Sequence, residues 1–308
     1  MSCESALLVG MRSKNRIKEF DMPFCIYTDQ DVSVELGNLD HIIPLSLGGS
    51  DDFCIWSDSD YNSELGSAVD GVIANDFLVM LARRDADARG HNKREPVPIW
   101  KRTTLAGQPV QVKLGREKIE VWDAKTRSIM PDEDVIGREF ETTHQVDRFD
   151  PIRFTAKVAL GAAYFIYEDA IRVAMDCNAL RQIISLDPVK ARVGQKLLPA
   201  GITVCDRLHA DANGDSATGS MYRGLCEFTN RSTVIAVPHD DSIGFHVGVL
   251  GMFMASIFIP ADTSTLPNDG LHDLGHVILL APGQMERISF RELALKFQRS
   301  IDEVDKEG

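Results

Sequence analysis

The sequence predicts an α+β protein with a small strand, loop, strand and helix unit near the N terminus. A larger domain of mixed helices and antiparallel strands is predicted to follow. Short β-branched and aromatic runs bounded by turn residues alternate with apolar residues at helical spacing. The 44% hydrophobic content is ordinary for a globular chain, and 308 residues suffice for two domains. We place the domains at residues 1–128 and 148–308, with a polar, acidic stretch between them.

The N-terminal unit is predicted from its strands, breaks and helix caps. Residues 24–27, 32–36 and 39–43 have strand composition, and Pro44 ends the third strand because it cannot donate a ladder hydrogen bond. A loop rich in Gly, Ser and Asp separates this strand from a further one at 53–56. The Ser and Asp residues that follow can accept the free amide hydrogens of a helix start. Apolar residues at helical spacing come next.

The remaining elements are predicted by the same patterns. The acidic stretch that holds the domain boundary is 126–150. We predict strands within 97–121 with turns at 106–108 and 114–116, helices at 154–175 and 289–297, and strands at 202–205, 221–228, 234–237, 245–250 and 255–259. The second domain thus has the composition of a helix-covered antiparallel sheet. Its role is predicted to be DNA positioning, dimerisation or regulation.

Three side chains of the N-terminal unit suit one kind of chemistry. Asp40 and His41 lie at the end of a predicted strand, and Asn62 lies at the start of the predicted helix. Carboxylate and amide oxygens bind hard divalent cations, and an imidazole can take a proton from water near neutral pH. Adjacent strand residues point to opposite faces, so Asp40 and His41 converge only where the strand twists or ends. The alternative is an ordinary strand end followed by an ordinary helix.

This segment resembles the HNH (ββα-metal, His-Me finger) nucleases over roughly residues 24–98. The resemblance rests on the run DHIIP at 40–44, the Gly-Gly loop at 48–49 and SDSDYN at 57–62. It also extends to bacterial HNH proteins with a long C-terminal extension, through the segments at 74–81, 87–91 and 153–161. Some of those proteins are similar to effectors of anti-phage defence systems.

The resemblance implies a role for each matched residue. His41 is implied to be the general base, and Asp40 and Asn62 are implied to hold one divalent metal ion, Mg²⁺ or Mn²⁺. The family orients its histidine with a residue, usually Asn, at the start of the second strand. In this sequence Asp52 is the nearest candidate for that position.

The cysteines depart from the family pattern. Many relatives hold the finger together with two Cys pairs on a structural zinc ion. Here Cys25 and Cys54 have no second Cys beside them, and two thiols cannot complete a four-ligand site. We therefore expect no structural zinc, and packing must replace it.

The charge of the chain is uneven. A net charge of −13 argues against strong indiscriminate DNA binding, which depends on neutralising phosphates. Lys and Arg are nevertheless concentrated between residues 83 and 127, where acids are fewer. The candidates for phosphate contacts beside the metal are Arg84, Arg89, His91 and Lys93. The alternatives are a solvated hairpin face and, for the imidazole, a brace for the preceding helix.

The sequence also bears on location. The chain has no apolar run long enough to cross a bilayer and no apolar centre of a secretory signal at its start. None of the six cysteines forms a Cys-x-x-Cys pair, which fits reduced thiols. We therefore expect a cytoplasmic protein without membrane contact.

Two functions from different classes fit these observations. The first is a metal-dependent DNA endonuclease, with a bacterial anti-phage or restriction effector as its setting. The second is a catalytically weak HNH-fold module that binds DNA or a partner and is active only with a second component. The missing zinc cysteines and the Asp at the usual Asn position motivate the second function. Both are compatible with a homo-oligomer or an activating partner protein.

Overall fold

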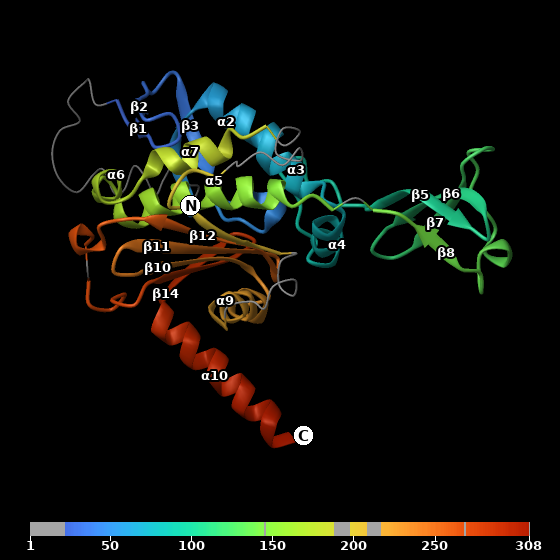
Figure 1. The fold of residues 1–308 in the computed structure, drawn as a ribbon. Coiled ribbons are helices and arrows are strands. Elements are labelled where there is room, and N and C mark those ends of the chain that lie inside the picture. Colours follow the sequence, from blue (N-terminus) through green and yellow to red (C-terminus); the bar gives the residue numbers. More distant parts are fainter. Residues whose placement is uncertain (1–21, 145, 188–197, 208–216, 268, 308) are drawn as a thin grey trace.

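The computed structural model describes residues 22–144, 146–187, 198–207, 217–267 and 269–307. The fold is α+β, as predicted, and the sheets of these residues are antiparallel. Figure 1 shows a main body, a lobe of strands that projects from one side, and a C-terminal helix that extends away from the body.

The N-terminal part contains a two-stranded sheet that leads into a helix. In the β3–β4 pair, His41 lies opposite Cys54. The Asp58 carboxylate caps α2 by accepting from the Tyr61 amide at 2.9 Å, as its composition predicted. The elements are β1 (Phe24–Cys25), β2 (Gln30–Asp31), β3 (Gly37–His41), η1 (Leu45–Leu47), β4 (Cys54–Asp58), α2 (Ser59–Leu65), the π-helical turn η2 (Gly66–Asp70), α3 (Gly71–Ala74) and α4 (Phe77–Asp85).

The strand predicted at 32–36 is wrong. The amides of Leu36 and Gly37 donate to the Ser33 carbonyl at 3.1 and 3.0 Å, so this segment is a tight turn that leads into β3. Val34 and Leu36 are 65% and 63% exposed, which shows that these apolar residues face no sheet core. The strand that pairs with β1 is instead β2, directly before this turn.

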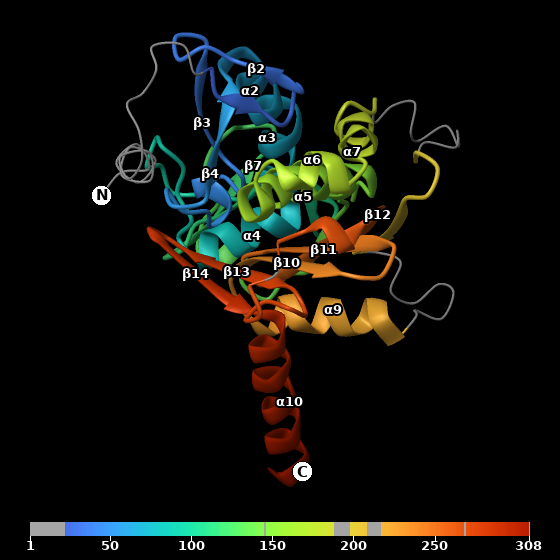
Figure 2. The same cartoon turned by 90° about the vertical axis from the view of Figure 1, so that its left-hand side faces the viewer.

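A six-stranded antiparallel sheet forms the C-terminal part. Its order is β14-β13-β10-β11-β12-β9. Its strands read as continuous apolar runs because both faces are covered: Val234 and Ala236 face the main core with α5, whereas Ile235 and Val237 face a second core with α9. Figure 2 shows the two helices on opposite sides of the sheet. The strands are β9 (Thr203–Asp206), β10 (Ser232–Pro238), β11 (Ser242–Val249), β12 (Met252–Pro260), β13 (His276–Ala281) and β14 (Gln284–Ser289).

The remaining helices of this part are α5 (Phe149–Tyr167), α6 (Ala170–Ala174), α7 (Cys177–Ile184), α9 (Ala217–Phe228), the short η4 (Thr263–Thr265) and α10 (Phe290–Glu307). The strand predicted at 221–228 is wrong, because these residues lie in α9. Tyr222, Leu225 and Cys226 are buried at helical spacing against the sheet. A short apolar run fits either structure, and the tertiary packing decides between them.

Helix α5 lies between the sheet and the N-terminal part. Its residues are buried almost along the whole length, which explains its nearly continuous apolar sequence. Gly161 permits the closest approach: a Cβ there would lie 2.6 Å from the Tyr27 hydroxyl oxygen. A larger residue would push the N-terminal part away from the helix.

The projecting lobe is a separate four-stranded sheet with its own small core. Its order is β7-β6-β5-β8, and its core contains Leu105, Val110, Val112, Leu114 and Val121. The predicted turn at 106–108 is confirmed: Ala106 and Gly107 both have positive φ and join the first two strands as a two-residue hairpin. The lobe comprises β5 (Ile99–Leu105), β6 (Gln108–Leu114), β7 (Ile119–Asp123), η3 (Asp132–Asp134) and β8 (Phe140–Thr142).

The hydrophobic core does not follow the predicted domain boundary. One cluster joins residues of the N-terminal part, such as Ile42 and Phe53, to Phe154 in α5 and Phe245 in the sheet. The lobe, which the sequence grouped with the N-terminal domain, packs apart from that cluster. The polar stretch 126–150 contributes β8 to the lobe. The chain thus has one main body built from both predicted domains, with the lobe inserted between them.

No single helix of the described residues is both long and apolar enough to cross a membrane. One bent pair, Ser59–Ala74 with Phe77–Asp85, meets the length and composition criteria jointly across a 79° bend.

Candidate functional site

The three side chains predicted to act together line one pocket. Asp40, His41 and Asn62 surround a hollow of about 380 Å³, and His91 and Asp70 line it as well. They come from the end of β3, the first turn of α2, the loop after α4 and the last residue of η2. The pocket therefore lies where the β3 strand end meets the helix that follows β4, as the local sequence pattern predicted.

His41 is positioned by a carboxylate on the loop between the two strands. Its Nε2 lies 2.9 Å from Asp51 Oδ1, and its side chain is 17% exposed. When Nε2 carries the hydrogen for this bond, Nδ1 keeps its lone pair and can accept a proton. The prediction that Asp52 orients the histidine is corrected here, because its neighbour Asp51 makes the contact. Sequence order alone cannot tell which of two adjacent loop residues points inward.

His91 lies against His41. The two ring centroids are 5.5 Å apart and the planes meet at 63°. This brings a second imidazole to the pocket from a loop fifty residues further along the chain.

Asn62 is held by another amide. The Nδ2 of Asn62 donates to Asn38 Oδ1 at 2.8 Å. With the amide in this orientation, Asn62 Oδ1 is available to a ligand. Asn38 also lines the pocket and was not predicted. It lies in β3 two residues before Asp40, and its side chain is exposed.

Asp40 points in the opposite direction from its neighbour, toward the protein interior. It is 4% exposed, and its Oδ2 accepts a hydrogen bond from the Tyr27 hydroxyl at 3.1 Å. The same oxygen lies 3.0 Å from the ammonium nitrogen of Lys157, a fully buried residue of α5. Asp40 is therefore part of a buried ion pair as well as part of the pocket wall.

Lys157 also pairs with Asp70, at 3.0 Å between Nζ and Oδ2. Burial alone would lower the pKa of Lys157, but the charges of Asp40 and Asp70 raise the pKa above its ordinary value, so the ammonium stays charged. Burial raises the pKa of Asp70 to about 6, against the attraction of Lys157. Burial first, and then the Asp40 charge, raise the pKa of the Tyr27 hydroxyl, which therefore stays a donor.

Sequence reasoning missed Asp70 and Lys157, although each left a signal. Asn62, Gly66 and Asp70 follow one another at four-residue spacing, which places them along one helix face. Lys157 is a cation within an apolar helical run, one helical turn after Arg153. A buried lysine needs a counter-charge, so its position predicts an acidic partner but does not identify it.

The four residues predicted to contact phosphate do not lie together. His91 lines the pocket with His41. Arg84 pairs with Asp85 and Arg89 with Asp87, each at 2.7 Å, so neighbouring acids already offset both charges. Lys93 is exposed on the loop after His91.

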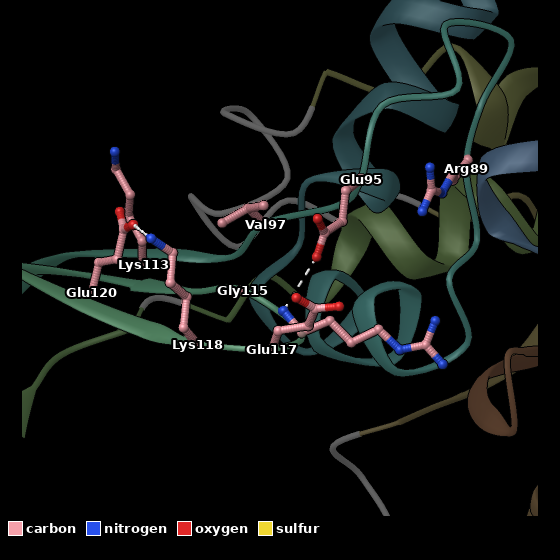
Figure 3. Close-up of a pocket in the computed structure, with 9 residues that line it drawn as sticks. Arg89, Glu95, Val97, Lys113, Gly115, Glu117, Lys118 and Glu120 are labelled. Atoms are coloured by element: carbon pink, nitrogen blue, oxygen red, sulfur yellow. Dashed lines mark hydrogen bonds and ion pairs between the residues drawn. The ribbon is translucent and has the colours of Figure 1, made fainter.

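Arg89 lines a different hollow, of about 590 Å³, between this loop and the lobe. Figure 3 shows the acids Glu95, Glu117 and Glu120 interspersed there with Lys113 and Lys118. Lys118 pairs with Glu120, and Arg116 lies 3.7 Å from Asp87. The segment that was basic in sequence thus forms a groove of mixed charge.

Cys25 and Cys54 are buried thiols. Cys25 Sγ lies 3.7 Å from Ser57 Oγ and 3.4 Å from the Asp58 amide nitrogen, and Cys54 Sγ lies 3.3 Å from the Asp51 carbonyl. Within the described part of the chain, no three His, Cys, Asp or Glu side chains are grouped so as to hold a metal ion.

Comparison with known proteins identified no relative. No family model, curated protein or solved structure matches this chain.

Proposed function

We propose that this chain is a metal-dependent endonuclease that hydrolyses phosphodiester bonds in DNA through an HNH-type site. The observation that carries the proposal is that Asp40, His41 and Asn62 line one pocket. The antiparallel pair β3–β4 followed by α2 supports the proposal, because the resemblance implies the order strand, strand and helix. The family resemblance itself rests on the sequence motifs.

A divalent metal ion fits the oxygen groups of the pocket. Asp40 and Asn62 would hold it, with water completing the shell, because Mg²⁺ and Mn²⁺ prefer oxygen ligands. Asp70 Oδ1 is buried at the same pocket and has no hydrogen-bond partner among the described residues. A buried carboxylate oxygen without a partner is the atom that a bound cation or its water would satisfy. When bound, the metal would polarise the phosphate and stabilise the leaving oxygen.

The protein's own groups carry the proton transfer in this proposal. Asp51 accepts from His41 Nε2–H, so Nδ1 is the atom that takes the proton from the attacking water. The carboxylate then stabilises the imidazolium that forms. In this proposal His91, whose ring lies against that of His41, would contact the phosphate or the leaving group.

The test is cleavage of plasmid DNA with Mg²⁺ or Mn²⁺. We expect His41→Ala to lower the rate by at least about 100-fold, the scale of general-base contributions, without changing the melting temperature. EDTA should stop the wild-type protein. His239→Ala is the matched control, because His239 lines a separate cavity with Tyr167 and should leave cleavage unchanged. Equal rates for wild type and His41→Ala would exclude this assignment.

A second candidate is a DNA- or partner-binding module without turnover of its own. The Lys157 ion pair favours it, since the cation already offsets the charge of Asp40. The mixed charge of the groove beside the lobe also favours it. A gel shift with no cleavage in any metal, and cleavage only after a second component is added, would support this candidate instead.

A further inference from the structure

Lys157 is the most deeply buried charged side chain near the pocket. It lies in the middle of α5 with 0% exposure. Its Nζ lies 3.0 Å from Asp40 Oδ2, from Asp70 Oδ2 and from the His41 carbonyl oxygen. Asp40 Oδ1 and the Ile42 carbonyl oxygen lie further away, both at 3.4 Å. The three shorter contacts match the three N–H donors of an ammonium.

The two carboxylates that Lys157 binds are both pocket residues, but Lys157 itself is not. Asp40 and Asp70 line the pocket, whereas the ammonium lies behind them in the core. The cluster of two carboxylates and one ammonium keeps one negative charge in excess. That remaining charge is available to a cation in the pocket.

Arg153, on the same helix, shows how this chain buries a cation for packing. It is 8% exposed, and its guanidinium donates to the carbonyls of Ile184 and Ala68 at 3.0 and 3.2 Å. Its acidic partner, Asp150, lies 3.5 Å away on the same helix and away from the pocket. Lys157 differs because it binds two acids of the candidate site.

The ion pairs of Lys157 join residues that are far apart in the sequence. Lys157 is 117 residues from Asp40 and 87 from Asp70 in sequence. It also fixes the main chain at His41, because the carbonyl of that residue accepts one of its hydrogens. One side chain of α5 therefore holds the end of β3 and the end of η2 at a set separation.

We propose that Lys157 is a positioning residue of the candidate site, which together with Asp70 sets the orientation and the effective charge of the Asp40 carboxylate. This inference rests on the proposed function. It predicts that the metal requirement of cleavage is tuned from within the core by a residue that touches neither metal nor DNA.

The first test changes Asp70 to Asn and measures the Mg²⁺ concentration for half-maximal plasmid cleavage. The substitution removes a negative charge from the pocket wall and leaves Asp40 to offset Lys157 alone. Both effects weaken metal binding, so we expect the required Mg²⁺ concentration to rise about tenfold, the scale seen when partners of metal ligands are removed.

Asp76→Asn is the matched control. Asp76 is also a largely buried acid, with 14% side-chain exposure, and pairs with Arg207, but it does not line the pocket. Asn retains the cap of α4 that Asp76 provides. The Mg²⁺ requirement of this variant should stay as in the wild type. A loss of folded protein lowers the rate at every Mg²⁺ concentration but does not move the midpoint, so a structural role alone cannot produce the shift.

The second test combines Lys157→Met with Asp70→Asn. The double variant keeps the charge balance of the cluster but removes the ammonium that fixes Asp40. Compared with Asp70→Asn alone, we expect cleavage at saturating Mg²⁺ to fall by at least about tenfold in protein that still melts cooperatively. Cleavage at the rate of Asp70→Asn would show that Lys157 only neutralises charge, and would overturn the proposal.

The outcomes separate the two proposals. If the wild type cleaves and Asp70→Asn needs the same Mg²⁺ concentration as Asp76→Asn, the inference about Lys157 is wrong and the proposed function stands. If the double variant does not fold, Lys157→Gln in the Asp70→Asn background replaces it, and the same comparison with Asp70→Asn at saturating Mg²⁺ decides. If the wild type cleaves nothing in any metal, the proposed function fails, and the inference fails with it.

Discussion

Two regions of this molecule bury titratable side chains in opposite ways. At the pocket, Lys157 is buried as an ion and pairs with two buried carboxylates, Asp40 and Asp70. In the C-terminal sheet, His246 is fully buried on β11 and its Nδ1 lies 2.6 Å from Ser256 Oγ. Burial holds the pKa of His246 well below its ordinary value, so this imidazole stays neutral.

The pocket is the region where burial of a titratable group costs more free energy. Removing a charge from water costs several kcal/mol even when a partner offsets part of it, whereas a neutral imidazole needs only its hydrogen bonds and contacts. His246 stacks on Tyr222 and behaves as a flat packing residue. Apolar residues of similar size would fill the same space without this cost. The presence of the charged cluster is therefore better explained by a role at the adjoining pocket than by a contribution to stability.

The largest expected effect is on the ionic region. Lys157→Met leaves two buried carboxylates without their cation, so we expect the free energy of unfolding to fall by about 3–5 kcal/mol. Urea titration followed by circular dichroism measures this loss. Adding Asp70→Asn to the same chain should recover part of the stability. A loss below about 1 kcal/mol would show that the cluster is relaxed by water and is not a dry ion pair.

The next expected effect is a difference in how the free energy of unfolding responds to lower pH in the two regions. Burial, followed by Arg287 and His272, lowers the pKa of His276, the first residue of β13, from 6.5 to about 4. Between these values the unfolded chain binds a proton that the folded chain does not. The free energy of unfolding therefore falls as pH drops from 6.5 to 4.

The contribution of Asp70 to stability changes with pH in the opposite direction. Its pKa is raised from 3.8 to about 6 by burial, so the folded chain binds the extra proton in that window and gains stability as pH falls. Denaturant midpoints at pH 7 and pH 4.5 test both signs. Relative to wild type, His276→Asn should lose less stability on acidification and Asp70→Asn should lose more. The same acid response in both variants would contradict the comparison.

The smallest expected effects come from one hydroxyl in each region. Tyr27→Phe removes the donor to the ionised Asp40, and we expect a loss of about 1.5–3 kcal/mol because that acceptor is charged. Ser256→Ala removes the partner of the neutral His246, and we expect about 0.5–1.5 kcal/mol. Thermal melts of the two variants side by side provide the measurement. An equal or reversed order would mean that the charge on Asp40 is screened.

The sequence predicted much of the candidate site because its parts are close in the chain. The Asp-His pair, the loop, the second strand and the capped helix lie within 39–62, where turn residues, proline and helix caps fix local structure. The same reasoning chose Asp52 over Asp51, since the orientation of adjacent loop residues depends on contacts that the pattern does not contain. It also assigned residues 221–228, which lie in α9, to a strand, because apolar content alone does not set the period.

By itself, the sequence determined the α+β class and the position of most strands, and it singled out four of the residues that line the pocket: Asp40, His41, Asn62 and His91. Only the tertiary structure decided that α5 carries a cation into the back of that pocket, that both halves share one core, and that neighbouring acids offset the charges of Arg84 and Arg89. The reason is range. Backbone propensities and side-chain periodicity act over a few residues, whereas an ion pair between residues 40 and 157 exists only once α5 has packed against β3.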